Sequence, residues 1–316
     1  MAKLKIKIMG NKNSNLKRSR SSMKKVQEFD IIESEEERKE KLLDYYLSTD
    51  AGSIDRLHMY HFLRGYIFQG NFSSPIENKL IKGGCKVLDI GCGPGTWLLD
   101  LSNKYENSHF FGVDIKPIFP QEIKPNNLEF IETDVTNGLS FHDNEFDLTH
   151  AELMSLMFTP QQWDFVLSEL IRVTKPGGYI EIADRRSGYV GEGPIFRRLT
   201  GSMWESHLNR NIDVKLVYNL DSKLKLLSNI GKVHRIEKDF IVGPNGGKIG
   251  LVFQDIAMSF FNSDIACEFI SKEMGISEKE YKNMIEELDE EFKQTSTECV
   301  HVRFWAQKQL LDEQSY

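Results

Sequence analysis

The chain has 316 residues, of which 40% are hydrophobic and 28% are charged, a composition typical of a globular protein and not of a disordered or fibrous one. Residues 1–25 contain nine lysines and arginines and no acidic residue, which leaves 31 basic and 47 acidic residues in the rest, a net charge of −16. A body this acidic repels phosphate backbones, so general nucleic-acid binding by the folded part is not expected.

The first 30 residues are rich in Lys, Arg, Ser and Asn and have no sustained apolar period, which indicates a basic disordered tail. The bases at 17–20 and 24–25 are compatible with a nuclear-import signal, a membrane-surface patch, or a solvated tail without a receptor. Residues 9–14 fit the N-myristoylation pattern only if Met9 is an alternative start of translation.

Residues 31–80 are expected to form a helical N-terminal extension. A charged amphipathic helix is predicted over residues 35–47, and a second helix, aromatic and basic, over residues 55–68. The second helix contains His58, Tyr60, His61 and Phe62. It is interpreted either as a lid over a site or as an ordinary packed helix.

Strands and helices alternate in the remainder, which we take as one domain over residues 81–316. Strands are predicted at 86–90, 109–115, 128–132, 146–150 and 179–183, with helices at 96–104 and 160–174. This alternation implies right-handed βαβ units and a parallel sheet. Three prolines in residues 116–127 predict an irregular loop in place of a crossover helix. A helix at 220–230, strands at 232–242 and 299–307, and a helical insertion near 249–296 (helices at 251–273 and 277–295) complete the domain.

The strongest motif is the run Gly91-Cys92-Gly93-Pro94-Gly95, which joins the first strand of this domain to the next helix. Glycines let the backbone turn sharply and approach a ligand, and the helix N-terminus offers unpaired N–H donors. The dehydrogenase fingerprint G-x-G-x-x-G needs a third glycine where this chain has Thr96. Asp89, just before the turn, would oppose a pyrophosphate but suits a ligand with an ammonium and a sulfonium. Its other interpretation is a buried turn residue.

Acidic residues also follow the next two strands. Asp114 ends the second strand, 19 residues beyond Gly95, where a carboxylate can accept both hydroxyls of a ribose. The other interpretation of Asp114 is a surface acid before the proline-rich loop. Asp134 follows the third strand and is placed either to accept from an adenine amino group, with the Val135 N–H nearby, or to cap a turn.

Polar residues after the fourth and fifth strands are candidates for the chemistry itself, since ligands of open α/β sheets bind at this edge. His150 and Glu152 are the candidate catalytic residues, and His150 is either a substrate-side base or a polar residue that closes the strand. Further residues that are candidates to face an acceptor are Asp184, Arg185, Trp204 and His207.

Over about residues 81–184 the chain resembles class I S-adenosylmethionine-dependent methyltransferases. The resemblance rests on motifs that occur in the same order: the glycine turn, Asp114, Asp134, Phe146-Asp147 and residues 175–179. The resemblance implies a Rossmann-like, three-layer α/β sandwich with a seven-stranded, mostly parallel sheet, strand order 3-2-1-4-5-7-6, an antiparallel last strand and a helical N-terminal cap. It also implies S-adenosyl-L-methionine as the cofactor, bound by Asp89, Gly91, Cys92, Gly93, Gly95, Asp114, Ile115, Asp134, Val135 and His150. Residues 70–76, with the helix at 56–68, resemble fungal methyltransferase-domain proteins that include regulators of secondary metabolism.

The function expected from this resemblance is transfer of a methyl group to a small-molecule or protein acceptor by in-line displacement. No Asn-Pro-Pro-Tyr or Asp-Pro-Pro-Tyr run follows the fourth strand, which disfavours methylation of DNA adenine. The alternative is a regulatory protein that holds the cofactor, has little catalytic activity and acts through a protein partner.

The cellular setting follows from features that the sequence lacks. Its four cysteines form no C-x-x-C pair, so no metal site or disulfide ladder is expected and a reducing compartment fits. No apolar stretch is long enough to span a bilayer, and no secretion-signal core is present at the start. We therefore expect a cytoplasmic protein, or a nuclear one if the basic tail is an import signal.

Overall fold

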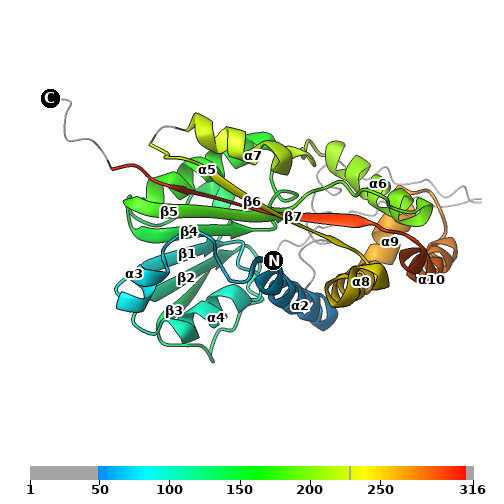
Figure 1. The fold of residues 1–316 in the computed structure, drawn as a ribbon, viewed down its shortest axis with the longest axis horizontal. Helices are drawn as coiled ribbons and strands as arrows, with labels where there is room; N and C mark the ends of the chain where they lie inside the picture. The colour runs from blue at the N-terminus through cyan, green and yellow to red at the C-terminus, as the bar shows by residue number, and fades with distance from the viewer. Residues whose placement is uncertain (1–48, 228, 311–316) are drawn as a thin grey trace, which may run out of the picture.

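A seven-stranded sheet forms the centre of the molecule, and helices cover both of its faces (Figure 1). The computed structural model describes residues 49–227 and 229–310. The predicted tail at 1–30 and the predicted helix at 35–47 lie outside the described residues.

The sheet has the strand order that the sequence predicted. The order is β3-β2-β1-β4-β5-β7-β6, in which β1 to β5 pair in parallel and β7 runs antiparallel to both β5 and β6. This confirms the order 3-2-1-4-5-7-6 with an antiparallel last strand. The strands are β1 (Lys86–Ile90), β2 (His109–Asp114), β3 (Leu128–Glu132), β4 (Phe146–Glu152), β5 (Thr174–Arg185), β6 (His234–Ile241) and β7 (Glu298–Gln307).

Helices account for most of the other described residues. None of those described combines the length and the apolar character that crossing a membrane requires. The α-helices are α2 (Ala51–Phe68), α3 (Glu77–Lys82), α4 (Thr96–Lys104), α5 (Pro160–Val173), α6 (Pro194–Leu208), α7 (Leu216–Leu226), α8 (Gly247–Phe261), α9 (Asp264–Glu273) and α10 (Glu278–Gln294); η1 (Val135–Asn137) and η2 (Pro244–Gly246) are single 3₁₀ turns.

Strand β1 lies in the interior of the sheet and is buried from Val87 to Ile90, which agrees with its mostly apolar sequence. Val87 packs in one hydrophobic cluster with Leu98 of α4, and the next residue, Leu88, packs in another with Trp163 of α5. Successive side chains of a strand point to opposite faces, so the sheet separates two helical layers. This is the three-layer arrangement expected from the sequence.

A third hydrophobic cluster joins α2 to the helices of the C-terminal half. Its buried members include Tyr60 of α2, Phe196 of α6, Phe253 of α8 and Ile285 of α10. Helices α2 and α8 pack against each other, although almost two hundred residues of sequence separate them, and Figure 1 shows them side by side. The N-terminal extension is thereby held against the helices that lie between β6 and β7.

Predicted and observed elements agree best where the sequence pattern is local. The predicted bounds of β1, β3 and α4 match the structure to the residue, and residues 116–127 form the expected loop without a helix. Helix α6 was not predicted, although its buried residues Phe196, Leu199, Thr200 and Met203 follow a helical period. The single helix expected over 251–273 is divided into α8 and α9, because Ser263 caps a new helix by accepting from the Ala266 N–H.

Candidate functional site

The carboxyl ends of β1, β2 and β4 surround a cavity of about 350 Å³. The cavity is lined by the glycine turn that follows β1 and by residues at the ends of β2, β3 and β4, and α2 and α8 contribute Arg56, Leu57 and Phe260. Of the ten residues predicted to bind a cofactor, six line this cavity: Gly91, Gly93, Asp114, Ile115, Asp134 and Val135.

The turn after β1 requires glycine because of its backbone and because of its neighbours. Gly91, Gly93 and Gly95 have φ angles of +65°, +53° and +74°, a region that side chains rarely adopt. A Cβ at Gly91 would lie 2.3 Å from the sulfur of Met154, whereas a Cβ at Gly93 would meet nothing closer than 4.0 Å. The loop therefore packs tightly at its start and faces open space at Gly93.

Asp114 connects the glycine turn to the end of β2. Its Oδ2 accepts the Gly93 N–H at 2.8 Å, and its Oδ1 accepts the Lys116 N–H at 2.9 Å. Burial raises the pKa of Asp114, and these two backbone donors act in the opposite direction. The carboxylate is 7% exposed and lines the cavity. The position that the sequence assigned to ribose binding is therefore a fixed acceptor at the cavity wall.

Asp89 and His150 form a buried pair behind the cavity. They are opposite each other on the neighbouring strands β1 and β4, and His150 Nδ1 lies 2.8 Å from Asp89 Oδ1. The indole of Trp97 stacks on the His150 ring, with centroids 4.0 Å apart. Burial raises the pKa of Asp89, an effect that the facing His150 opposes. His150 has no exposed surface, so the structure places it beneath the turn and not at the cavity wall.

The remaining predicted cofactor residues divide between the cavity and its surroundings. Asp134 lines the cavity and also caps η1, accepting from the Thr136 N–H at 2.9 Å and from its hydroxyl at 2.7 Å. Both roles considered for Asp134 from the sequence are thus compatible with its position. Cys92 and Gly95 do not line the cavity, and burial raises the pKa of the Cys92 thiol well above its ordinary value.

Glu152, the other candidate catalytic residue, ends β4 and lines the cavity. It forms an ion pair with Arg64 of α2, whose side chain is 1% exposed. Burial lowers the pKa of Arg64 to about 10, which still leaves it charged at neutral pH. The pair links α2 to the edge of the sheet beside the cavity.

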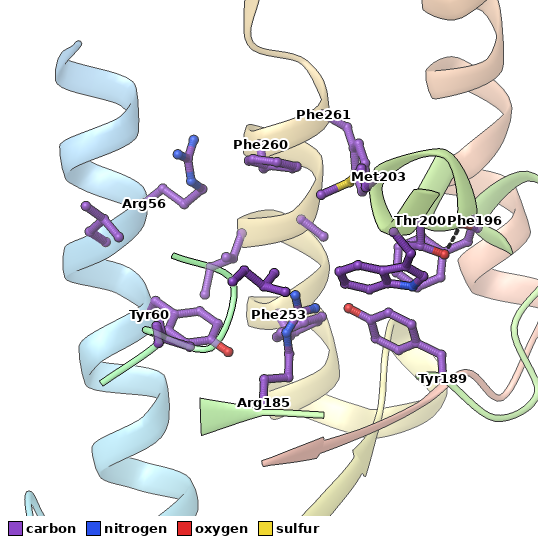
Figure 2. Close-up of a pocket in the computed structure, with 16 residues that line it drawn as sticks. Arg56, Tyr60, Arg185, Tyr189, Phe196, Thr200, Met203, Phe253, Phe260 and Phe261 are labelled. Atoms are coloured by element: carbon purple, nitrogen blue, oxygen red, sulfur yellow. Dashed lines mark hydrogen bonds between the residues drawn. The ribbon is translucent and has the colours of Figure 1, made fainter. Parts of the chain in front are cut away.

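A second, smaller cavity of about 160 Å³ adjoins the first and shares Arg56, Leu57, Leu153 and Phe260 with it (Figure 2). Its walls come from α2, α6, α8 and the end of β5. Of the residues that the sequence suggested for an acceptor site, Arg185 and Trp204 line it, as does Tyr60 of the helix that was interpreted as a lid or as an ordinary packed helix. The contribution of α8, and that of the α6 residues other than Trp204, was not anticipated, because these residues lie far along the chain.

Other residues suggested for the acceptor site have different roles in the structure. Asp184 is buried, and its two oxygens accept the Ser155 and Arg185 N–H groups at 2.8 and 2.7 Å. His207 is buried in α6 with its Nδ1 2.6 Å from the Met203 carbonyl oxygen. On α2, Phe62 is 64% exposed and is absent from both cavity walls.

Leu153 has an unusual backbone at the boundary between the two cavities. Its φ angle is +58°, and its N–H donates to the Ala183 carbonyl on β5 at 2.9 Å. A residue with a side chain in this region costs about 1–3 kcal/mol and persists only where its surroundings impose it. The chain therefore makes a strained turn directly after β4, and the Leu153 side chain lies in the wall common to both cavities.

Lowering the pH below neutrality is expected to destabilise the protein, because His61 is buried as a neutral ring. Burial lowers its pKa to about 4, although the Asp100 carboxylate 3.7 Å away acts in the opposite direction. In the unfolded chain His61 is protonated with a pKa near 6.5, whereas in the folded chain its pKa is about 4. The free energy of unfolding therefore falls as the pH drops from 6.5 to 4. Urea unfolding should show a loss of roughly 2 kcal/mol from this residue between pH 7 and pH 5.

The variant His61→Gln should lose less stability than the wild type over the same pH range. Burial also lowers the pKa of His207 and His301, so part of the dependence remains in this variant. The matched change His142→Gln, at an exposed position, should leave the wild-type dependence as it is. Equal pH dependence in His61→Gln and the wild type would show that His61 is not responsible.

Comparison with known proteins identifies similar sequences over much of the chain. A family model described as a methyltransferase domain matches residues 87–178. The N-methyltransferase verN of Clonostachys rogersoniana is 24% identical over 278 residues, which cover 84% of this chain and 92% of that protein. The secondary metabolism regulator LAE1 of Cochliobolus heterostrophus is 29% identical over 143 residues, 43% of this chain and 44% of that protein. The chain thus matches less than half of the length of that regulator.

Among solved structures, phosphoethanolamine N-methyltransferase 2 of Haemonchus contortus is similar at 19% identity and a TM-score of 0.48, over 85% of this chain and 59% of that one. The domain match at 87–178 includes the glycine turn, Asp114 and Asp134. Together with the strand order of the sheet, it confirms the resemblance to class I methyltransferases.

Proposed function

We propose that this protein, whose residues 87–178 match a methyltransferase domain, is an S-adenosylmethionine-dependent methyltransferase that acts on a small-molecule or protein acceptor. The observation that carries the proposal is the position of Asp114. Its buried carboxylate lines the larger cavity and is fixed there by the N–H of the glycine turn, where it can accept the hydroxyls of a ribose.

The residues around the larger cavity fit a cationic nucleoside without phosphates. Its wall contains three carboxylates, Asp114, Asp134 and Glu152, and two basic side chains, Arg56 and Lys116. A pyrophosphate would lie among these acids, whereas a ligand with an ammonium and a sulfonium is attracted by them. The open space beside Gly93 leaves room for the backbone to approach such a ligand.

S-adenosylmethionine, when bound, supplies a sulfonium methyl group that an acceptor lone pair takes in line as the carbon–sulfur bond breaks. The glycine turn and Asp114 hold and orient the donor at the ends of β1 and β2. The side chains of Leu153 and Phe260 border both cavities, and their apolar surfaces would disfavour water between the two reactants. Glu152 is the carboxylate that we propose to receive the proton of an acceptor N–H or O–H group.

The alternative is a regulatory protein that binds the cofactor and acts through a partner. The similarity to secondary metabolism regulators favours it, and that similarity covers less than half of their length. The second cavity favours the enzyme, because it offers space for an acceptor beside the proposed donor site. Experiments must therefore determine whether the protein transfers a methyl group to an acceptor or acts through a protein partner.

Two experiments on the full chain test the proposal. In calorimetric titrations with S-adenosylhomocysteine and with NAD, we expect binding of the first and none of the second. If millimolar S-adenosylhomocysteine does not bind while NAD does, the assignment fails. Incubation with tritiated S-adenosylmethionine and cell extract then separates the alternatives, because label transfer that disappears in Asp114→Ala is expected of an enzyme and not of a regulator.

A further inference from the structure

The smaller cavity has an unusual combination of aromatic walls and positive charge. Seven of its sixteen lining residues are Phe, Tyr or Trp, and the others include two arginines, Arg56 and Arg185. No acidic residue and no histidine belongs to this lining, in the part of the chain that the structure describes. A cavity of this composition attracts an anion that also has an apolar body.

Arg185 is placed to bind such an anion. It is the last residue of β5, and its side chain extends from the strand into the cavity, between the ring of Phe253 and that of Tyr189 (Figure 2). The guanidinium carbon lies 5.4 Å from the Tyr189 ring centroid and 5.9 Å from that of Phe253. Both rings stabilise the cation through their faces and leave its N–H groups available.

The N–H groups of the Arg185 guanidinium have no protein acceptor among residues 49–227 and 229–310. The adjacent carboxylate, that of Asp184, accepts two backbone N–H groups on the other side of the strand. Arg186, the next residue, does not line the cavity, and its guanidinium forms an ion pair with Glu237, with Nη1 and Oε2 3.8 Å apart, and lies over the Tyr218 ring. The planar guanidinium of Arg185 therefore has N–H donors available for a ligand, and their geometry and charge match those of a carboxylate.

The size of the cavity limits the body of the ligand. Its volume of about 160 Å³ is close to that of engineered apolar cavities of about 150 Å³ that accept benzene. We propose that this cavity is the acceptor site and that the acceptor is a small aromatic compound with a carboxylate, which pairs with Arg185 while its ring packs among the aromatic walls. The assignment as acceptor site rests on the proposed methyltransferase function, whereas carboxylate binding does not.

Calorimetric titration of the full chain, with and without saturating S-adenosylhomocysteine, tests the proposal with two pairs of probes: phenylacetate against phenylacetamide, and indole-3-acetate against indole-3-acetamide. The carboxylates should bind about 10- to 100-fold more tightly than the neutral amides, as expected for charge-assisted hydrogen bonds. Arg185→Gln should abolish this preference and leave S-adenosylhomocysteine binding unchanged. Arg186→Gln, the matched control, should retain both.

A second variant keeps the proposal testable if Arg185→Gln does not fold. Ala257→Leu on α8 narrows the same cavity without removing a charge, and it should weaken carboxylates and amides together. Equal affinity for carboxylates and amides in the wild type, or equal losses in Arg185→Gln and Arg186→Gln, would overturn the proposal. If instead the proposed methyltransferase function is wrong, S-adenosylhomocysteine will not bind, whereas the preference for carboxylates over amides will remain.

Discussion

Replacing Asp114 with alanine is expected to weaken S-adenosylhomocysteine binding by about 10- to several-hundred-fold, since each hydrogen bond from a ribose hydroxyl to a carboxylate contributes about 1.5–3 kcal/mol. The change also removes the acceptor of the Gly93 N–H and so releases the glycine turn from the end of β2. Calorimetric titration measures the change in affinity, and label transfer from tritiated S-adenosylmethionine should fall with it.

The control for this prediction is the acid at the end of the neighbouring strand. Glu132 is paired with Asp114 in the register of β2 and β3, but it is exposed and does not line the cavity. Glu132→Ala should therefore bind S-adenosylhomocysteine as the wild type does. If both variants bind equally well, the carboxylate of Asp114 does not contact the cofactor, and the central observation behind the proposed function is lost.

Replacing Glu181 with glutamine is expected to destabilise the fold by about 3–5 kcal/mol, the usual cost of leaving one partner of a buried ion pair uncompensated. Glu181 on β5 has no exposed surface, and its Oε1 lies 3.9 Å from the Nε of Arg303 on β7, which is 2% exposed. Burial lowers the pKa of Arg303, and the charge of Glu181 opposes this effect. The same carboxylate accepts the N–H groups of Ser73 and Ser74, so it also holds the segment after α2 against the sheet.

Urea unfolding at neutral pH measures the effect of Glu181→Gln. The double variant Glu181→Gln with Arg303→Met should recover part of the loss, because removing both charges avoids an unpaired ion in the interior. A single variant within about 1 kcal/mol of the wild type, the range of exposed ion pairs, would show that the pair is effectively solvated and not buried.

The elements that the sequence predicted correctly are those whose signals are local. The apolar run of β1, the glycine turn and the start of α4 occupy consecutive residues, and the structure places them at the predicted positions. The acids after β2 and β3 could be assigned to one edge of the sheet because parallel strands end together. This reasoning gives Asp114 and Asp134 their places beside the larger cavity.

The environment of His150 could not be predicted from the order of the strands alone. The sequence places it at the carboxyl edge of the sheet but does not give the register between β4 and β1, which sets it opposite Asp89. Nor does it give the position of Trp97, which covers the His150 ring. Strand β4 continues two residues beyond His150, to Glu152, and the residue that covers the His150 ring comes from another element of the chain.

The smaller cavity could not be predicted because its walls are assembled from distant segments. Helix α6 was missed, and the packing of α2 against α8 joins residues near positions 60 and 253. Arg185 and Trp204 were suggested from their places after β5, but the aromatic surroundings of the guanidinium follow from the tertiary structure alone. Sequence periodicity shows which face of a helix is apolar and leaves open what that face covers.

Most residues of the two cavities come from different parts of the chain, although Arg56, Leu57, Leu153 and Phe260 line both. The glycine turn, Asp114 and Asp134 lie within residues 87–178, whereas Arg56, Tyr60, Arg185 and Phe253 lie outside that range. Recombination that exchanges the flanking helices between related genes would thus replace most of the smaller cavity and keep most of the larger one. A chimaera that keeps residues 87–178 and takes its flanks from a relative should inherit donor affinity from one parent and acceptor preference from the other.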